Sequence, residues 1–437
     1  MRDPRLQQVD LTPPSTRDES MTGQRWTQRA LTCAFAVMAA ACVFLPSPAV
    51  AQDGSQLRVW LLTAAPGDQV WERYGHNAIR VLDERTGRDV SYNWGIFDFQ
   101  QVDFIPRFLR GEMLYSMAAF DTEAMVAAYA RANREVVLQE LALTPEQKLR
   151  LVSLAETNLL PENRDYIYQY FLDNCSTRVR DMLDAVLGGA LNLQYSPQPS
   201  GTSYRDNTQR LTQVDPLIFT GMDLALGAPT DASISVWEEM FIPMTLRDEL
   251  RTFRVVRPDG GSEPFVRSEQ VVVTSTRAAD PEAPPGWFGL YAALGGLLAL
   301  VFASMRTSAV QSRTWLRRTI TGLAVAWYSL WGTLGAILVA LLFTDHTFAF
   351  RNENLFLAHP LLWLAAFALL LSARGGKWGD RAGVVALMGA AIGLIGLFAQ
   401  LLPMMTHANA HFFALILPGH LALAFGLISH RGRSPGR

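Results

Sequence analysis

Apolar residues are concentrated in two parts of the chain, and a more polar segment of more than 200 residues separates them. The first apolar run covers residues 30–50, follows two arginines, and ends in an Ala-Val-Ala sequence at residues 49–51. A basic start, an apolar middle and an A-x-A exit are typical of a cleavable secretory signal peptide. We therefore expect residues 1–51 to be an N-terminal extension with a signal peptide. The alternative is an uncleaved signal anchor.

The second apolar part is the C-terminal third, where five stretches are long enough to cross a membrane. At about 1.5 Å per helical residue, each can span a hydrocarbon core of about 30 Å. Basic residues follow the first, third and fifth stretches, and the positive-inside rule places those segments in the cytoplasm. The pattern predicts a multi-pass plasma (inner) membrane protein with an outward-facing N-terminal domain and a cytoplasmic C-terminus. The predicted spans are 287–305, 319–343, 356–373, 382–402 and 411–429.

Between the signal peptide and the first span, the periodicity predicts strands first and helices afterwards. Alternating and β-branched stretches predict strands, and apolar residues at helical spacing behind capping residues predict helices. This order predicts an α+β domain followed by an all-α membrane domain of five helices. The predicted strands are 57–63, 76–82, 90–98 and 134–142, and the predicted helices are 121–131, 145–158 and 175–187.

The same pattern predicts how the chain is divided. After the N-terminal extension and signal peptide we expect a thiol catalytic domain, a loop-rich accessory region with a hairpin, a short linker, the five-span domain and a cytoplasmic tail. The predicted boundaries are 1–51, 52–189, 190–280, 281–286, 287–430 and 431–437. A net charge of −2 gives no reason to expect nucleic-acid binding.

Cysteine usage indicates where chemistry could occur. Cys33 and Cys42 lie in the predicted signal peptide, so the exported part keeps only Cys175, and its only histidine is His76. An unpaired thiol is unusual in an oxidising compartment, where cysteines are normally found in disulfides. Cys175 is therefore either a small buried hydrophobe or a nucleophile, and His76 is either a hydrogen-bonded core residue or its base.

The residues around Cys175 favour the nucleophile. Asp173 or Asn174 is a good helix N-cap, so Cys175 falls in a first turn, where free N–H groups and the helix dipole favour a thiolate. The same N–H groups could hold an oxyanion. We take Asn174 and Ser176 as candidates to orient the site or to line that oxyanion position.

His76 lies on a predicted strand and can act as general base for the thiol. The next strand offers Asn93 to orient the imidazole, with Tyr92 as second choice. One Cys and one His leave too few ligands for zinc, and the G-x-S-x-G sequence of serine hydrolases is absent. We expect neither a metal nor another cofactor.

The chain resembles a known family at these residues. A histidine on an early strand, followed by Asn-Cys at a helix start, is the order of circularly permuted papain-like thiol enzymes. More closely, GHNAIRV, YNWGIFDF, LTPEQ, DNCSTRVRD and a later FIP are similar to the Lnb N-terminal periplasmic domain family, over about residues 55–280. ENLFLAHPL and HANAHFFALILPGH in the membrane part also resemble many members.

The resemblance implies that Cys175 is the nucleophile and His76 the base. The founding activity of the family is lipoprotein N-acylation, which implies an acyl transfer at the outer leaflet from a membrane lipid or lipoprotein ester to an amine. A thiol peptidase or amidase acting on cell-wall peptides, and a non-catalytic envelope scaffold, remain alternatives.

Two predicted outward loops of the membrane part carry polar residues. A rim that binds lipid head groups or the lipoprotein substrate is one interpretation, and an ordinary solvated loop is the other. The candidate substrate-binding residues are Asn352, Asn354, His407, Asn409 and His411.

Overall fold

The computed structural model describes most of the chain beyond the predicted signal peptide. That signal peptide and the predicted tail 431–437 lie outside the described residues, so both stay predictions. The described residues are 53–257, 260–372 and 377–428.

An antiparallel sheet of seven described strands forms the core of the N-terminal part. Every strand pairs antiparallel with its neighbours. The strands that the sequence predicted are confirmed within a few residues. In order across the sheet they are β11 (Val266–Val273), β5 (Val136–Leu141), β1 (Leu57–Ala64), β2 (His76–Asp83), β3 (Arg88–Ile96), β4 (Leu114–Asp121) and β6 (Asp165–Ile167).

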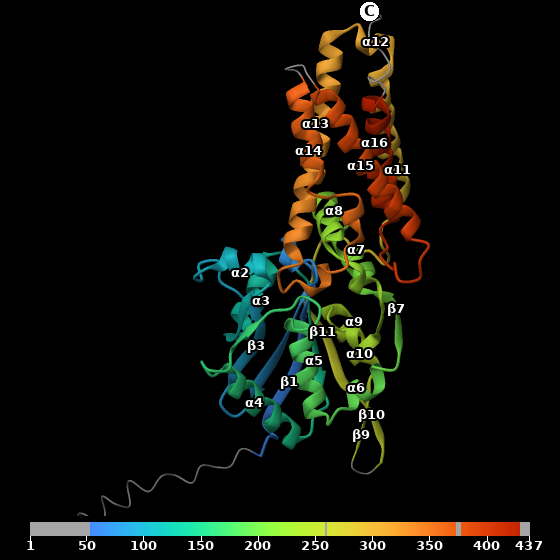
Figure 1. Cartoon of the computed structure of the whole chain (residues 1–437). Helices are drawn as coiled ribbons and strands as arrows, with labels where there is room; N and C mark the ends of the chain where they lie inside the picture. Colours follow the sequence, from blue (N-terminus) through green and yellow to red (C-terminus); the bar gives the residue numbers. More distant parts are fainter. Residues whose placement is uncertain (1–52, 258–259, 373–376, 429–437) are drawn as a thin grey trace, which may run out of the picture. The chain divides into compact units, whose positions relative to one another are not determined.

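Alternation along the strands gives the sheet two different faces. Even-numbered residues of β1, such as Leu62, pack with α3 (Thr122–Arg131), whereas odd-numbered ones, such as Leu61, belong to the larger core. This larger core is built with residues of α4 (Pro145–Leu159), α5 (Cys175–Val186) and α10 (Pro243–Thr252). Figure 1 shows α4 and α5 beside the strands. His76 and Asn77 therefore point to opposite faces of β2.

The region expected to be loop-rich, 190–280, instead contains a series of short helices and strands. Side-chain caps begin several of them, including Ser203 for α7 and Asp215 for α8. The helices have 4 to 10 residues, which is too short for a clear apolar period in the sequence. The region also supplies β11 and α10 to the sheet and its core, and its predicted hairpin is confirmed. The further elements are α6 (Ala190–Tyr195), β7 (Pro199–Ser203), α7 (Tyr204–Thr212), α8 (Pro216–Ala225), η2 (Ala228–Asp231), β8 (Ser233–Ser235), α9 (Val236–Glu239), β9 (Arg254–Val256) and β10 (Ser262–Pro264).

Helices dominate the C-terminal part. Four of the described helices are long and apolar enough to cross a membrane. The predicted third span forms a helix of only 11 residues, α14, next to a segment outside the described residues. The five-span count is therefore not confirmed. The elements are α11 (Phe288–Ala303), η3 (Ser304–Arg306), α12 (Ser308–Gln311), α13 (Thr314–Leu341), η4 (Thr347–Ala349), η5 (Glu353–Phe356), α14 (Leu362–Ser372), α15 (Trp378–Ala399) and α16 (Ala410–Ile428), and Figure 1 labels the main helices.

The segment before α14 explains the short helix. Residues 353–361 pack against neighbouring helices, and a Cβ placed on Gly335 of α13 would lie 2.4 Å from the His359 Cα. Pro360 follows and cannot donate a helical hydrogen bond. Irregular backbone at membrane depth is tolerated where protein buries it. The amino-acid composition of this segment is apolar, as in a spanning helix, so composition alone could not show that the segment is not helical.

A buried ion cluster holds α8 in place between the two parts of the structure. Arg205 of α7 is 1% exposed, and its guanidinium contacts Asp223 of α8 at 2.5 Å and Asp231 of η2 at 2.7 Å. Leu224, next to Asp223, is buried in the cluster formed by the apolar helices. The ion cluster therefore links the fold of the accessory region to the bundle.

Replacing Arg205 should destabilise the protein strongly. In Arg205→Met the two buried carboxylates of Asp223 and Asp231 lose the guanidinium that neutralises them, and breaking such a buried pair typically costs about 3–5 kcal/mol. The control is Arg251→Met, because Arg251 pairs with Glu269 at the surface, where such a pair contributes about 0–1 kcal/mol. Thermal unfolding of the full chain in detergent should show a large loss of Tm for Arg205→Met only. Equal Tm values for both variants would contradict this assignment.

Candidate active site

Cys175 is the first residue of α5, as the sequence predicted. Asn174 is the N-cap, and its Oδ1 accepts hydrogen bonds from the N–H groups of Ser176 at 2.8 Å and Thr177 at 2.9 Å. The Thr177 hydroxyl accepts from the Asn174 N–H at 2.8 Å, which completes a capping box. The Cys175 N–H has no partner within the helix, because the first N–H groups of any helix lack one.

The side chains of Asn174 and Ser176 bind the start of α5 to backbone carbonyls of neighbouring segments. The Asn174 amide donates to the carbonyls of Tyr170 at 3.1 Å and Phe241 at 2.9 Å. The Ser176 hydroxyl donates to the Met240 carbonyl at 2.7 Å. With these partners, neither side chain is available as an oxyanion donor, and the orienting role stays a prediction.

Asn77 ties the start of α5 to the sheet, and sequence reasoning did not single it out. Its Nδ2 donates to the Ser176 Oγ at 3.0 Å, and its Oδ1 accepts from the Thr63 hydroxyl at 2.8 Å. Asn77 is fully buried. The available cue was a polar residue at a core-facing position of a predicted strand, directly after His76.

Asn93 contacts His76 through its side-chain amide. Its Oδ1 lies 3.1 Å from the His76 Nε2, and its Nδ2 donates to the Ser91 carbonyl at 2.9 Å. The second bond assigns the amide orientation, so the oxygen faces the imidazole. β2 and β3 pair Ala78 with Asn93, which places Asn93 diagonally from His76 on the same face. This contact leaves Nδ1 of the ring for another partner.

Tyr92, the second choice for that role, is placed elsewhere. Adjacent strand residues point to opposite faces, so Tyr92 points into the larger core, away from the face of Asn93. Its hydroxyl donates to Glu156 of α4. Tyr92 is therefore a core residue and does not contact His76.

The Cys175 thiol and the His76 imidazole lie close enough for each to shift the pKa of the other. Burial raises the pKa of Cys175, but the charge of His76 and the backbone N–H groups of Asn77 and Ser176 outweigh burial and leave this pKa lowered. Burial lowers the pKa of His76, but the Cys175 thiolate and Asn93 outweigh it and leave that pKa raised. Both shifts favour a thiolate beside an imidazolium.

Arg134 is the cation near His76, a role that the sequence did not indicate. Its positive charge opposes protonation of His76, so it reduces the rise in the pKa of that ring without cancelling it. Its guanidinium donates to the Ala65 carbonyl at 2.7 Å and pairs with Glu72 at 3.2 Å. The arginines nearer in sequence have other partners, since Arg178 pairs with Asp173 and Arg180 with Asp181.

Gly95 and Tyr166 complete the surroundings of the sulfur. Gly95 has a φ of +88°, and a Cβ placed on it would lie 3.5 Å from the Cys175 Cβ and 4.0 Å from the Tyr166 Oη. The Tyr166 hydroxyl is buried without a side-chain partner and faces the backbone of Gly95. A thiolate at Cys175 contributes to raising the pKa of Tyr166 after burial, which leaves the hydroxyl as a proton donor.

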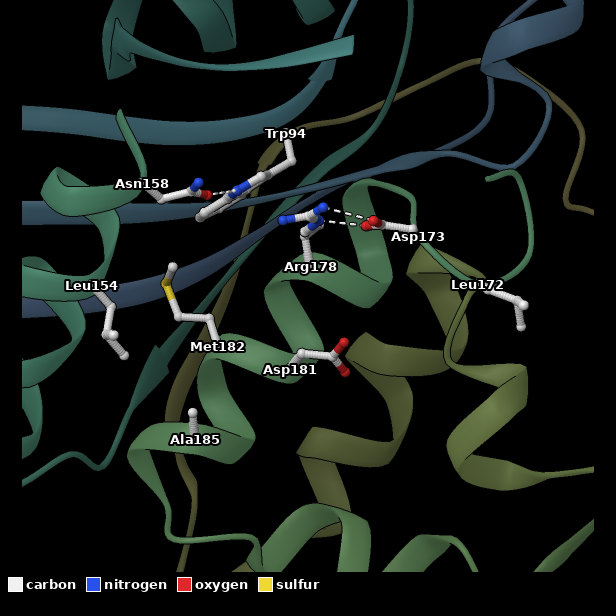
Figure 2. Close-up of a pocket in the computed structure, with 9 residues that line it drawn as sticks. All are labelled: Trp94, Leu154, Asn158, Leu172, Asp173, Arg178, Asp181, Met182 and Ala185. Carbon is white, nitrogen blue, oxygen red and sulfur yellow. Dashed lines mark hydrogen bonds and ion pairs between the residues drawn. The ribbon is translucent and has the colours of Figure 1, made fainter. Parts of the chain in front are cut away.

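A pocket of about 440 Å³ lies along α5. In Figure 2 the Arg178–Asp173 pair and the bond between Trp94 and Asn158 border this pocket. Its lining includes neither Cys175 nor His76.

Within the described residues there is no group of three or more His, Cys, Asp or Glu side chains that could hold a metal ion.

The polar residues predicted as a substrate-binding rim lie in a buried junction. Asn352 and Asn354 donate to the Leu224 carbonyl at the end of α8, at 2.8 and 3.1 Å. Two bonds link the two loops to one another: His407 accepts from the Glu353 N–H at 3.1 Å, and the Asn409 side chain donates to the Asn354 side chain at 2.9 Å. A third contact reaches α8, where His411 lies 2.7 Å from Asp223. An open rim is therefore the wrong description of these residues, and a role in binding stays a prediction.

Comparison with known proteins identifies the part of the chain that holds this site. Residues 49–210 match the family model described as the Lnb N-terminal periplasmic domain. The family that the motifs indicated is thus confirmed for this region, which includes His76, Asn93 and Cys175. No curated protein and no solved structure matches the chain. Together with four apolar helices, the Lnb domain indicates a membrane protein with a periplasmic N-terminal domain.

The ionisation of Cys175 in the Lnb domain can be tested by alkylation. Because the pKa of Cys175 is lowered, its reaction with iodoacetamide should persist at a pH below the ordinary thiol pKa of about 8.5. His76→Gln removes the main favourable partner and should move the midpoint of the rate profile to higher pH. Mass spectrometry of the Cys175 peptide separates this reaction from that of other cysteines. An ordinary thiol midpoint in both proteins would contradict the pairing.

Proposed function

We propose that this protein is a thiol acyltransferase of the outer leaflet, in which Cys175, His76 and Asn93 act as nucleophile, base and orienting amide. The single observation that supports this most is the thiol at a helix start beside an imidazole that Asn93 contacts, with each of the two groups shifting the pKa of the other. An inert buried cysteine would need neither a base nor an oriented imidazole. The chain order of histidine before cysteine is that of permuted papain-like enzymes, and we extend that fold assignment to this domain.

The first half-reaction forms a thioester. The Cys175 thiolate attacks the carbonyl carbon of a lipid ester, and a carbon–sulfur bond forms as the carbonyl oxygen becomes an oxyanion. Collapse of this intermediate breaks the ester carbon–oxygen bond. The departing alcohol takes the proton from the His76 imidazolium, which returns to the neutral ring.

The second half-reaction transfers the acyl group to an amine. The amine nitrogen attacks the thioester carbonyl while His76 accepts its proton. A carbon–nitrogen bond forms, the carbon–sulfur bond breaks, and Cys175 leaves as a thiolate beside the imidazolium. The N-terminal amine of a lipoprotein is the acceptor that we propose, and the reaction is then an N-acylation.

The proposal assigns two groups to stabilise the oxyanion. One is the Cys175 N–H, which lacks a partner within the helix. The other is the Tyr166 hydroxyl, which lies near Gly95 and is proton-bearing. Donors of this kind act by stabilising the charge that develops in the transition state.

The membrane helices give this chemistry its location. With basic loops inside, the catalytic domain lies on the periplasmic side and the C-terminus in the cytoplasm. A site joined to the bilayer meets its lipid donor at high effective concentration. A soluble cell-wall peptidase would gain nothing from four apolar helices.

The acyl-enzyme is the decisive intermediate. Incubating the full chain with phospholipid in mixed micelles should add the mass of one fatty acyl group to Cys175, whereas Cys175→Ala should show no adduct. On addition of a diacylated lipoprotein, the adduct should disappear and the lipoprotein N-terminus should gain the same mass. Both masses are read by mass spectrometry.

Other outcomes of this experiment would support the alternatives. Release of peptides from purified cell wall, without an acyl adduct, would indicate the peptidase or amidase. No adduct, no peptide release and an unchanged phenotype of Cys175→Ala would indicate a scaffold.

Removing the Tyr166 hydroxyl should slow acylation without changing the thiol. Tyr166→Phe should reduce the rate of adduct formation about 10²–10³-fold, the usual effect of losing one oxyanion donor. The pH profile of alkylation at Cys175 should stay unchanged. Tyr195→Phe is the matched control, because that buried hydroxyl donates to the Glu249 carbonyl. Equal acylation rates for the two variants would contradict the role of Tyr166.

A further inference from the structure

The Lnb domain exposes a continuous apolar surface on one short helix and on the loops beside it. α2 (Phe104–Arg110) and its preceding loop have a sequence in which most apolar side chains face outward, and Val102 is 84% and Ile105 67% exposed. Soluble proteins rarely expose large contiguous apolar patches without a partner. We call this surface the apolar ridge; its residues are Trp71, Phe99, Val102, Ile105, Phe108 and Leu109.

Aromatic contacts make the ridge continuous. Trp71 and Phe99 have ring centroids 5.6 Å apart, and Phe99 and Phe104 are 5.1 Å apart. Phe104 stacks on Phe108 at 6.3 Å. The ridge is therefore one surface that runs from the loop before β2 to the end of α2.

The end of α2 is fastened to the segment that leaves α13. The Asp345 N–H donates to the Arg110 carbonyl at 2.7 Å, and the His346 Nε2 lies 3.0 Å from the Phe108 carbonyl. A Cβ on Gly111 would lie 2.9 Å from the Asp345 backbone, so the two chains are in close contact. Asp345 follows the last residue of α13, Leu341, by four positions.

The length of α13 indicates where the contact between α2 and Asp345 lies relative to the hydrocarbon core of the membrane. Its 28 residues extend about 42 Å, which exceeds a hydrocarbon core of about 30 Å. Arg317 and Arg318 lie near its start, where the positive-inside rule places the cytoplasmic interface. A core of about 30 Å measured from Arg318 takes about 20 residues, so Asp345 lies just beyond the outer end of the core. α2 is bonded to that segment and therefore lies at the same level.

The composition of α2 fits an interface with lipid. Arg107 and Arg110 lie in its last turn, next to the exposed apolar side chains. Basic residues combined with large apolar ones are typical of helices that lie in the headgroup region. Phe343, two residues before Asp345, is a further exposed apolar side chain on this segment, 85% exposed.

We propose that α2 and the apolar ridge lie in the outer leaflet as a monotopic anchor, with bilayer phospholipid as the occupant of this surface. The anchor would add a second lipid contact to the spanning helices and hold the Lnb domain against the membrane. Phe97 packs on Trp71 and comes two residues after Gly95, where an added Cβ would lie 3.5 Å from the Cys175 Cβ, so the ridge leads toward the site. Only this last step, delivery of an acyl chain to the thiol, rests on the proposed function.

Depth measurement by electron paramagnetic resonance tests the anchor directly. The full chain with Cys33, Cys42 and Cys175 replaced by serine receives one cysteine, Ile105→Cys or Leu109→Cys, and a nitroxide label. The control is Leu193→Cys, because Leu193 is an exposed leucine of α6, 80% exposed and remote from α2 in sequence. Each protein is reconstituted in nanodiscs of phosphatidylethanolamine and phosphatidylglycerol.

Molecular oxygen concentrates in the bilayer, whereas a nickel chelate stays in water. The ratio of their collision rates with the nitroxide label therefore reports the depth of the label in the membrane. We expect labels at residues 105 and 109 to collide more with oxygen than with the chelate, and the label at 193 to do the reverse. Labels at 105 and 109 that behave like the label at 193 would overturn the proposal. Because Cys175 is absent from all three proteins, the result does not depend on catalysis, and failure of the anchor is distinct from failure of the acyltransferase.

Discussion

The site depends on how the start of α5 is held against the first residues of β2. Asn174 caps the helix and is bound to the Phe241 carbonyl, while Ser176 is bound to Asn77 on the strand. These neutral hydrogen bonds are buried, and breaking one would leave an unsatisfied polar group, which costs about 1–3 kcal/mol. They fix the position of Cys175, and the pairing of β2 with β3 fixes His76 and Asn93. The thiol and the imidazole come together because two rigid elements meet.

A second set of polar contacts joins the Lnb domain to the apolar helices. Asn352 and Asn354 satisfy carbonyls at the end of α8, and Arg205 holds α8 through Asp223. Buried polar and charged side chains are expensive unless they are paired, so the arrangement favours a single docked position of α8. The junction therefore restricts where the proposed catalytic site can lie relative to the membrane surface.

The sequence predicted local features well and long-range contacts poorly. The cap at Asn174, the strand of His76 and the choice of Asn93 followed from capping rules and from the period of two along a strand. Asn77, Arg134 and Tyr166 were missed, because their importance comes from contacts with residues distant in the chain. The irregular segment before α14 was missed for a different reason, since apolar composition does not distinguish a buried irregular segment from a span. The family model locates the domain at 49–210, and the proposed acyl transfer depends on the geometry within it.

The most direct test of the account is the ionisation of Cys175, observed by infrared spectroscopy. The S–H stretch falls in an otherwise empty window of a protein spectrum, and Cys33→Ser with Cys42→Ser leaves Cys175 as the only source. The account predicts that the S–H band of the full chain disappears at a lower pH than for a free cysteine, and that His76→Gln shifts this disappearance to higher pH. A band that persists to the ordinary thiol pKa, equally in both proteins, would contradict the thiolate–imidazolium pair.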